Sequence, residues 1–201
     1  MTERLDCKLM RADDTSGTDT VLQWGENVTH RVEWGWRMCE TGCLHYYAHP
    51  LLAAFMDPIH GCYTTDGKTA RLRRVKARKR ASDGTKCGTE RLTTLELIEL
   101  PQPTTIQRVA FGVLASLAIY DAPEYVQWAE DWLSGKDRTA YAARVAAYPA
   151  AYVAADVAAY AAAYAARAAA DVAAYVAAYA ARGAAVSIDL VSVALKAMEV
   201  E

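Results

Sequence analysis

The chain has 201 residues, with 22 Lys and Arg against 24 Asp and Glu, a formal charge of −2 and 53% hydrophobic residues. This length suits one or two domains, which usually contain about 100–200 residues each. The near-neutral charge and ordinary hydrophobic content exclude a disordered acidic or basic chain. The totals conceal two local biases. Residues 154–182 contain 18 alanines in 29 positions, and residues 68–80 contain eight basic residues and no acid.

Strand-like and turn-rich patterns fill the chain up to residue 102. Short apolar runs separated by turn residues predict strands over residues 4–10, 21–24, 28–34, 71–80 and 92–100. A short helix over 51–56 follows Pro50, and Asp57-Pro58 is expected to end it. We therefore expect residues 1–102 to form an α+β domain with a small mixed or antiparallel sheet and one short helix.

Helical signals fill residues 103–201. Thr104 and Gln107 have the spacing of a capping box, and they precede apolar residues at helical intervals. A second helix is expected from Pro123 to Gly135. We expect Asp137 to cap a third helix.

Pro149 should kink or break this third helix. It is then expected to run to Arg182, and a final helix should begin at Ser187 or Asp189. The predicted fold class is thus α+β, with the small N-terminal sheet followed by an all-α C-terminal bundle that includes one long Ala-rich helix.

The Ala-rich helix contains an internal repeat. Residues 154–167 recur at 169–182 with one difference, Ala161 against Val176. A helical wheel gathers four tyrosines within about 100° of one another and leaves alanine on the opposite side; they are Tyr160, Tyr164, Tyr175 and Tyr179. We expect the alanine side to pack on another helix, either within the chain or in a homodimer. The tyrosines are candidate partner-binding residues, because tyrosine is enriched at binding hot spots. A plain strong helix former in a bundle is the alternative.

The basic run is the strongest charge feature of the sequence. Its candidate partner-binding residues are Arg71, Arg73, Arg74, Lys76, Arg78, Lys79 and Arg80. On a strand, Arg74, Lys76, Arg78 and Arg80 would share one face at intervals of about 6.6 Å, a spacing near that of phosphates in a nucleic acid. The alternative is a solvated edge strand whose charges prevent aggregation. The expected partner is an acidic macromolecular surface, either of a host protein or of a nucleic-acid complex.

Metal-ligating and catalytic residue types form no familiar signature. Cys39, Cys43, His45 and Cys62 are close in sequence, but their spacing differs from that of common zinc sites, so metal binding stays open while no metal or cofactor is expected. Five cysteines in a chain of this length, with no apolar segment of the signal-peptide type at residue 1, favour reduced thiols in a cytoplasm. The paired carboxylates of Asp13 and Asp14 are expected to be solvated.

Two segments resemble a family of uncharacterised bacteriophage proteins. They are Met38 to His45 with His49 to Ala53, and Trp128 to Asp137 with the Ala-Tyr repeats that follow. The second segment also resembles Ala-rich helical proteins described as putative immunity proteins. The resemblance implies a phage accessory protein in the host cytoplasm that inhibits a host factor or an antiviral, CRISPR-type nucleic-acid complex.

A different resemblance is to the strand and helix beside the NAD pocket of ADP-ribosyltransferase-like folds, carried by Gly42 to His45 and Pro50 to Ala53. It implies His45 or Tyr46 near the nicotinamide, Glu96 as the acid, and Arg31 or His30 on the first strand. A structural virion or assembly component is a third possibility. The absence of catalytic motifs favours a binding protein over an enzyme. Asp156, Arg167 and Asp171 in the Ala-rich stretch argue against a membrane span.

Overall fold

The structure is a computed structural model that describes residues 4–17, 21–35, 42–60, 63, 70–118, 121, 123–139 and 188–201, with only the backbone given for 58–60. The chain divides into two compact units, Met1–Gln102 and Pro103–Glu201. Each is described by itself below.

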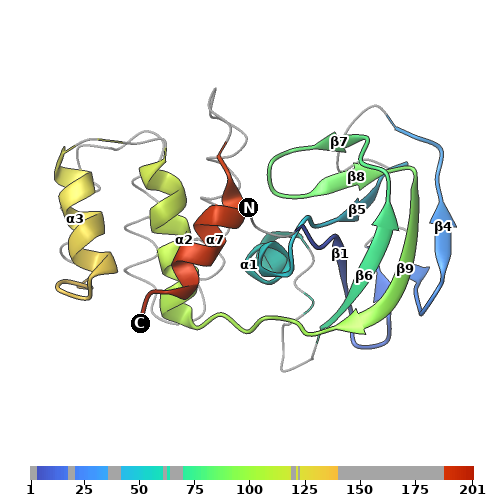
Figure 1. Ribbon diagram of the computed structural model, residues 1–201, viewed down its shortest axis with the longest axis horizontal. Helices are drawn as coiled ribbons and strands as arrows, with labels where there is room; N and C mark the ends of the chain where they lie inside the picture. Colours follow the sequence, from blue (N-terminus) through green and yellow to red (C-terminus); the bar gives the residue numbers. More distant parts are fainter. Residues whose placement is uncertain are drawn as a thin grey trace. The chain divides into compact units, whose positions relative to one another are not determined.

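Antiparallel sheets dominate the first unit. The largest has the strand order β1-β6-β9-β4 and curls into half a barrel (Figure 1). Its strands are β1 (Cys7–Met10), β6 (Arg71–Ala77), β9 (Arg91–Ile98) and β4 (Thr29–Arg31). A two-stranded sheet pairs β2 (Thr15–Ser16) with β3 (Leu22–Gln23). A three-stranded sheet contains β5 (Leu44–Tyr46), β8 (Cys87–Thr89) and β7 (Ala81–Ser82).

A hydrophobic core fills the inner side of the curled sheet. It contains Met10, Trp24, Leu44, Tyr46, Val75, Cys87 and Leu92. Val75 and Leu92 point inward because alternate residues of a strand face opposite sides of the sheet. Their neighbours Lys76, Arg91 and Thr93 therefore point to the outer side of the sheet.

Helix α1 (Pro50–His60) packs against β1, and its residues from Leu51 to Asp57 are all buried. The expected end of this helix at Asp57-Pro58 is wrong, because the helix continues to His60. A proline removes only one backbone donor, and burial of the apolar helix outweighs that loss. The carboxylate of Asp57 instead accepts a hydrogen bond from the backbone N–H of Tyr63 at 2.9 Å.

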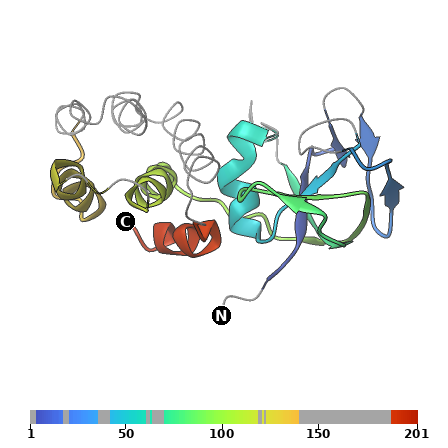
Figure 2. The same ribbon diagram turned by 90° about the horizontal axis from the view of Figure 1, so that it is seen from above.

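The described residues of the second unit form three helices, α2 (Thr105–Leu117), α3 (Pro123–Leu133) and α7 (Leu190–Met198). Helix α2 lies beside both α3 and α7 (Figure 2). The capping box of Thr104 and Gln107 is confirmed, since each side chain accepts a hydrogen bond from the backbone of the other residue. Asp189 caps α7 by accepting from the N–H groups of Val191 and Ser192.

The expected fold class is wrong. Within the described part of the chain there are nine strands in three sheets and four helices, so the protein is sheet-rich and is not a small sheet followed by an all-α bundle. The four strands that the sequence did not predict, β2, β5, β7 and β8, have only two or three residues each, which is too short for alternation to reveal. The predicted long Ala-rich helix lies outside the described residues. No helix in the described ranges has the length and apolar character needed to cross a bilayer.

Candidate functional site

A β-bulge divides the basic strand β6 into a structural part and an exposed part. The register with β9 shifts between Arg73 and Val75, so Leu72 and Arg73 are both buried while Arg74 and Lys76 are exposed. Arg73 is only 7% exposed. A bulge of this kind re-aims side chains along a strand. Arg73, one of the candidate partner-binding residues, is therefore not part of an exposed row of cations.

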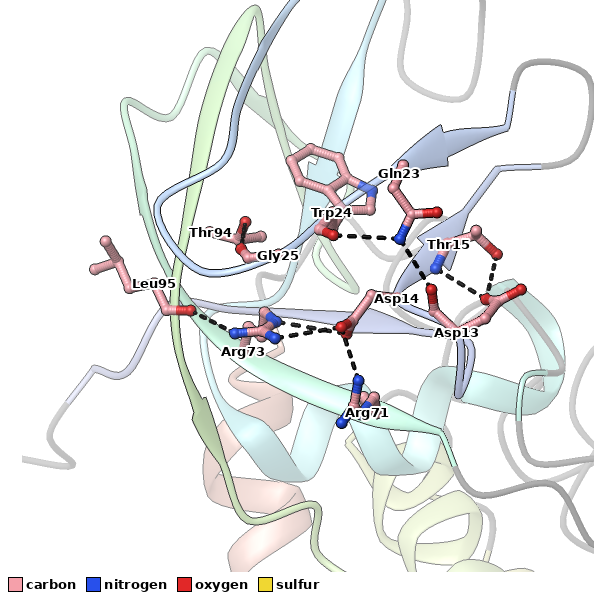
Figure 3. Close-up of polar contacts among 10 residues, drawn as sticks. All are labelled: Asp13, Asp14, Thr15, Gln23, Trp24, Gly25, Arg71, Arg73, Thr94 and Leu95. Atoms are coloured by element: carbon pink, nitrogen blue, oxygen red, sulfur yellow. Dashed lines mark hydrogen bonds and ion pairs between the residues drawn. The ribbon is translucent and has the colours of Figure 1, made fainter.

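Asp14 neutralises the structural part of the strand (Figure 3). Its Oδ2 lies 2.7 Å from Nη1 of Arg71 and 3.3 Å from Nη2 of Arg73. Arg73 also donates to the backbone carbonyl of Leu95 at 3.1 Å. The expectation that Asp14 is solvated is wrong, because its side chain is only 13% exposed.

The turn between β1 and β2 presents Asp14 to β6. Asp14 has a φ of 61°, in the left-handed region that Asp and Asn tolerate better than most residues. Its carbonyl accepts from the N–H of Trp24 at 2.8 Å. The carboxylate of Asp13 accepts from both the N–H and the hydroxyl of Thr15, which fixes the turn. Contacts of this turn, and with the residue that follows β3, thus hold the anion that Arg73 needs.

The exposed part of β6 lies beside residues of β9 and β4 on the outer side of the curled sheet. Lys76 pairs with Thr93, and Thr93 in turn pairs with Thr29, so the three form one row across the sheet. The hydroxyl oxygens of Thr29 and Thr93 are 2.8 Å apart and share a hydrogen bond. This row places one cation and two hydroxyl groups on the outer side of the sheet.

Two arginines form the adjacent row. Arg31 of β4 is directly opposite Arg91 of β9, and both are exposed. Arg78 is also exposed and follows Ala77, which faces the core. The four cations define the surface that we call the outer basic face: Arg31, Lys76, Arg78 and Arg91.

The outer basic face keeps its positive charge within the described structure. Its four cations form no ion pair with any described carboxylate, whereas the nearby Arg74 and Arg80 do. Arg74 Nε lies 2.6 Å from Glu96 Oε1, and this hydrogen bond lowers the pKa of the Glu96 carboxyl. Arg80 is paired with Glu90 at 2.9 Å.

The sequence-predicted basic residues therefore have three different environments. Arg71 and Arg73 bind Asp14, and Arg74 and Arg80 are paired with glutamates. Lys76, Arg78 and Lys79 are exposed without an ion pair among the described residues. The four candidate tyrosines, Tyr160, Tyr164, Tyr175 and Tyr179, lie outside the described residues.

Sequence reasoning missed Arg91 as a partner-binding residue and considered Arg31 only for an NAD site. The two arginines are 60 positions apart, and only the pairing of β4 with β9 brings them together. Alternation would have indicated that Arg91 is exposed, because it precedes the buried Leu92. Only the order of the strands in the sheet shows that the neighbour of Arg91 is Arg31.

The structure describes only part of the Cys and His cluster. Cys43 and His45 lie at β5, whereas Cys39 and Cys62 lie outside the described residues. No set of three or more His, Cys, Asp or Glu side chains in the described ranges is arranged to hold a metal ion. Cys7 and Cys87 are free thiols, and both are buried.

The residues implied for an NAD site lie on different surfaces. Tyr46 is fully buried in the inner core, and His30 packs edge-on against Trp24 with ring centroids 4.5 Å apart. Glu96 and Arg31 are instead exposed. Glu96 and Tyr46 thus do not face a common space. This placement does not favour an acid acting beside a nicotinamide at Tyr46.

Comparison of the chain with protein families, with curated proteins and with solved structures gives no match.

Proposed function

We propose that this protein functions by binding an acidic macromolecule on the outer basic face. The observation that carries the proposal is the opposition of Arg31 and Arg91, two exposed cations in directly paired positions. Like charges in such positions destabilise a sheet. An arrangement that costs stability but gathers positive charge is typical of a surface that receives an anion.

The chemistry of this face fits a nucleic-acid backbone. Arginine donates paired hydrogen bonds to phosphate, and threonine hydroxyls are common phosphate donors. Lys76 on β6 and Arg78 just beyond its end are two positions apart, which corresponds to about 6.6 Å in extended chain and is near the distance between successive phosphates. No aromatic residue interrupts the basic run from Arg71 to Arg80 in the sequence, so backbone contact rather than base stacking is expected.

The cellular role that the phage resemblance implies is part of this proposal. In that role the protein occupies the nucleic-acid channel, or the acidic surface, of a host defence complex and blocks it. Because occupying such a surface requires no catalytic group, the proposed mechanism is competition for binding.

Titration of the protein with fluorescently labelled single-stranded DNA, duplex DNA, RNA and poly-glutamate tests the proposal. We expect saturable binding to at least one nucleic acid, weakening steeply as salt rises because counter-ions are released on binding. Binding to poly-glutamate alone would show an acidic protein to be the partner class instead. Absence of binding to every polyanion at low salt would contradict the proposal.

A further inference from the structure

Three arginines of the outer basic face form one line across the curled sheet. Arg31 of β4 is directly opposite Arg91 of β9, and Ala77 of β6 is opposite Leu92 of β9. Antiparallel partners run in opposite directions, so the residue after Ala77 lies opposite the residue before Leu92. Continuing the register by this one residue places Arg78 opposite Arg91. We call this line the arginine row; it runs from Arg78 through Arg91 to Arg31.

The pairing of the strands gives the spacing within the arginine row. The N–H of Val32 donates to the carbonyl of Glu90 at 3.0 Å, so these two residues form a hydrogen-bonded pair. Because the two kinds of pair alternate along antiparallel strands, Arg31 and Arg91 form a non-hydrogen-bonded pair, in which the Cα atoms are only about 4.5 Å apart. Neighbouring strands are about 4.8 Å apart, so the three arginines span roughly 10 Å of the sheet.

The curvature of the sheet separates the ends of the arginine side chains. The arginine row lies on the outer, convex side of a sheet that curls into half a barrel (Figure 1). Side chains on a convex surface diverge as they leave the backbone, so the guanidinium groups lie farther apart than the Cα atoms. Their spacing thereby approaches the distance between successive phosphates of a nucleic acid, and each arginine can meet a different phosphate.

The arginine row is the longest line of unpaired cations on this face. In the strand direction only Lys76 and Arg78 are aligned. The line that crosses the sheet at Lys76 continues through Thr93 and Thr29, whose hydroxyl groups bond to each other at 2.8 Å and carry no charge. Glu33, two positions after Arg31, is exposed, and it forms no ion pair with the row among the described residues. Positive charge is therefore continuous across the strands rather than along them.

We propose that the arginine row binds successive phosphates of a single-stranded nucleic acid that crosses β6, β9 and β4 at right angles to the strands. This inference rests on the function proposed for the outer basic face and specifies the ligand and its path. A flexible single strand can bend over the convex row and present one phosphate to each arginine. A DNA duplex has a persistence length of about 150 base pairs, so it cannot follow this surface and would touch it at fewer points.

Comparison of Arg31→Gln with Lys76→Gln tests the direction of the path. Both changes remove one exposed cation from the outer basic face, but only Arg31 belongs to the arginine row. Fluorescence anisotropy with a short labelled oligothymidylate gives the slope of log K against log salt. We expect Arg31→Gln to reduce this slope by about one and Lys76→Gln to reduce it by less than about half as much. An equal or larger loss in Lys76→Gln would overturn the inference but leave the proposed function standing, since binding to the face would remain.

Comparison of a single strand with a duplex of equal length tests the class of ligand. At equal salt we expect the single strand to bind at least about threefold tighter, although a duplex carries the higher charge density and would win by charge alone. DNA and RNA single strands of matching sequence should bind within about threefold of each other, because the row contacts phosphates. Tighter binding of the duplex would overturn the inference and retain the proposed function. Binding of no nucleic acid would overturn both.

Discussion

Arg31 and Arg91 lie directly opposite each other on the antiparallel strands β4 and β9, with both side chains exposed on the outer side of the curled sheet. Neither forms an ion pair with a carboxylate in the described part of the chain. This pair concentrates positive charge where the fold itself gains nothing from it. Its contribution to stability and its contribution to binding should therefore have opposite signs.

Replacing Arg31 with Gln should stabilise the folded protein slightly while weakening its binding to a polyanion. Relief of the repulsion with Arg91 should raise the free energy of unfolding by about 0.2–0.5 kcal/mol. Urea denaturation measures this change. Lys196→Gln on α7 is the control, and it should alter neither property. A loss of stability in Arg31→Gln would contradict the expected repulsion.

Asp14→Asn should be strongly destabilising, since it leaves Arg73 buried without its anion. Breaking a buried ion pair costs about 3–5 kcal/mol, and asparagine retains the left-handed backbone, so the loss reports charge rather than strain. Arg71 is the other partner of Asp14, and the Arg71 side chain is 42% exposed. Arg71→Gln should therefore lower the free energy of unfolding by less than about 1 kcal/mol. Denaturant unfolding of both variants gives the comparison. Equal losses would show that Arg73 does not depend on Asp14.

Folding stability should decrease as the pH falls from 6.5 toward 4. The pKa of His45 is about 4 in the folded protein, because burial, Lys86 and Lys8 disfavour its charged form, and about 6.5 when unfolded. The unfolded chain thus binds more protons in this interval, so acid favours unfolding. The depressed pKa makes folding weaker at pH 4 than at pH 7 by up to about 3 kcal/mol.

His45→Gln should flatten this pH dependence, which unfolding curves at several pH values would show. The pKa of His49 is also lowered by burial, so His49 contributes in the same direction and a residual slope should remain. A slope in His45→Gln identical to that of the parent protein would contradict the assignment of the effect to His45.

Gln107→Ala should destabilise the second unit at two places. The side chain of Gln107 accepts from the N–H of Thr104 at 2.9 Å, and it donates to the carbonyl of Met198 at the end of α7, also at 2.9 Å. Loss of the cap costs about 1 kcal/mol, and the second hydrogen bond adds about as much. Thr104→Ala, which removes only the cap, is the matched comparison. Hydrogen exchange at the end of α7 should quicken in Gln107→Ala alone.

Local signals in the sequence predicted the local elements and failed for those that depend on pairing. The capping box at Thr104 is a contact between residues three apart, and it is present as predicted. Asp14 and Arg73 are 59 positions apart, so no local pattern indicated that this acid neutralises that base. The bulge between Arg73 and Val75 likewise arises from pairing with β9 and has no local signature in the sequence.

The short strands explain the error in fold class. A two-residue strand such as β7 is formed by its pairing with β8 and has no alternation of its own. The outer basic face was predictable in its β6 part, because the basic run is dense in the sequence. Arg31 and Arg91 can be assigned to this face only from the strand order β6-β9-β4, which the sequence does not show.

The most direct test of the outer basic face is the salt dependence of nucleic-acid binding in the double variant Arg31→Gln/Arg91→Gln. Fluorescence anisotropy with the tightest-binding oligonucleotide gives the dissociation constant at several salt concentrations. The account predicts weaker binding and a slope of log K against log salt reduced by about two, one for each lost phosphate contact. The charge-matched control Lys136→Gln/Lys196→Gln should keep the parent slope. An unchanged slope in Arg31→Gln/Arg91→Gln would contradict the account.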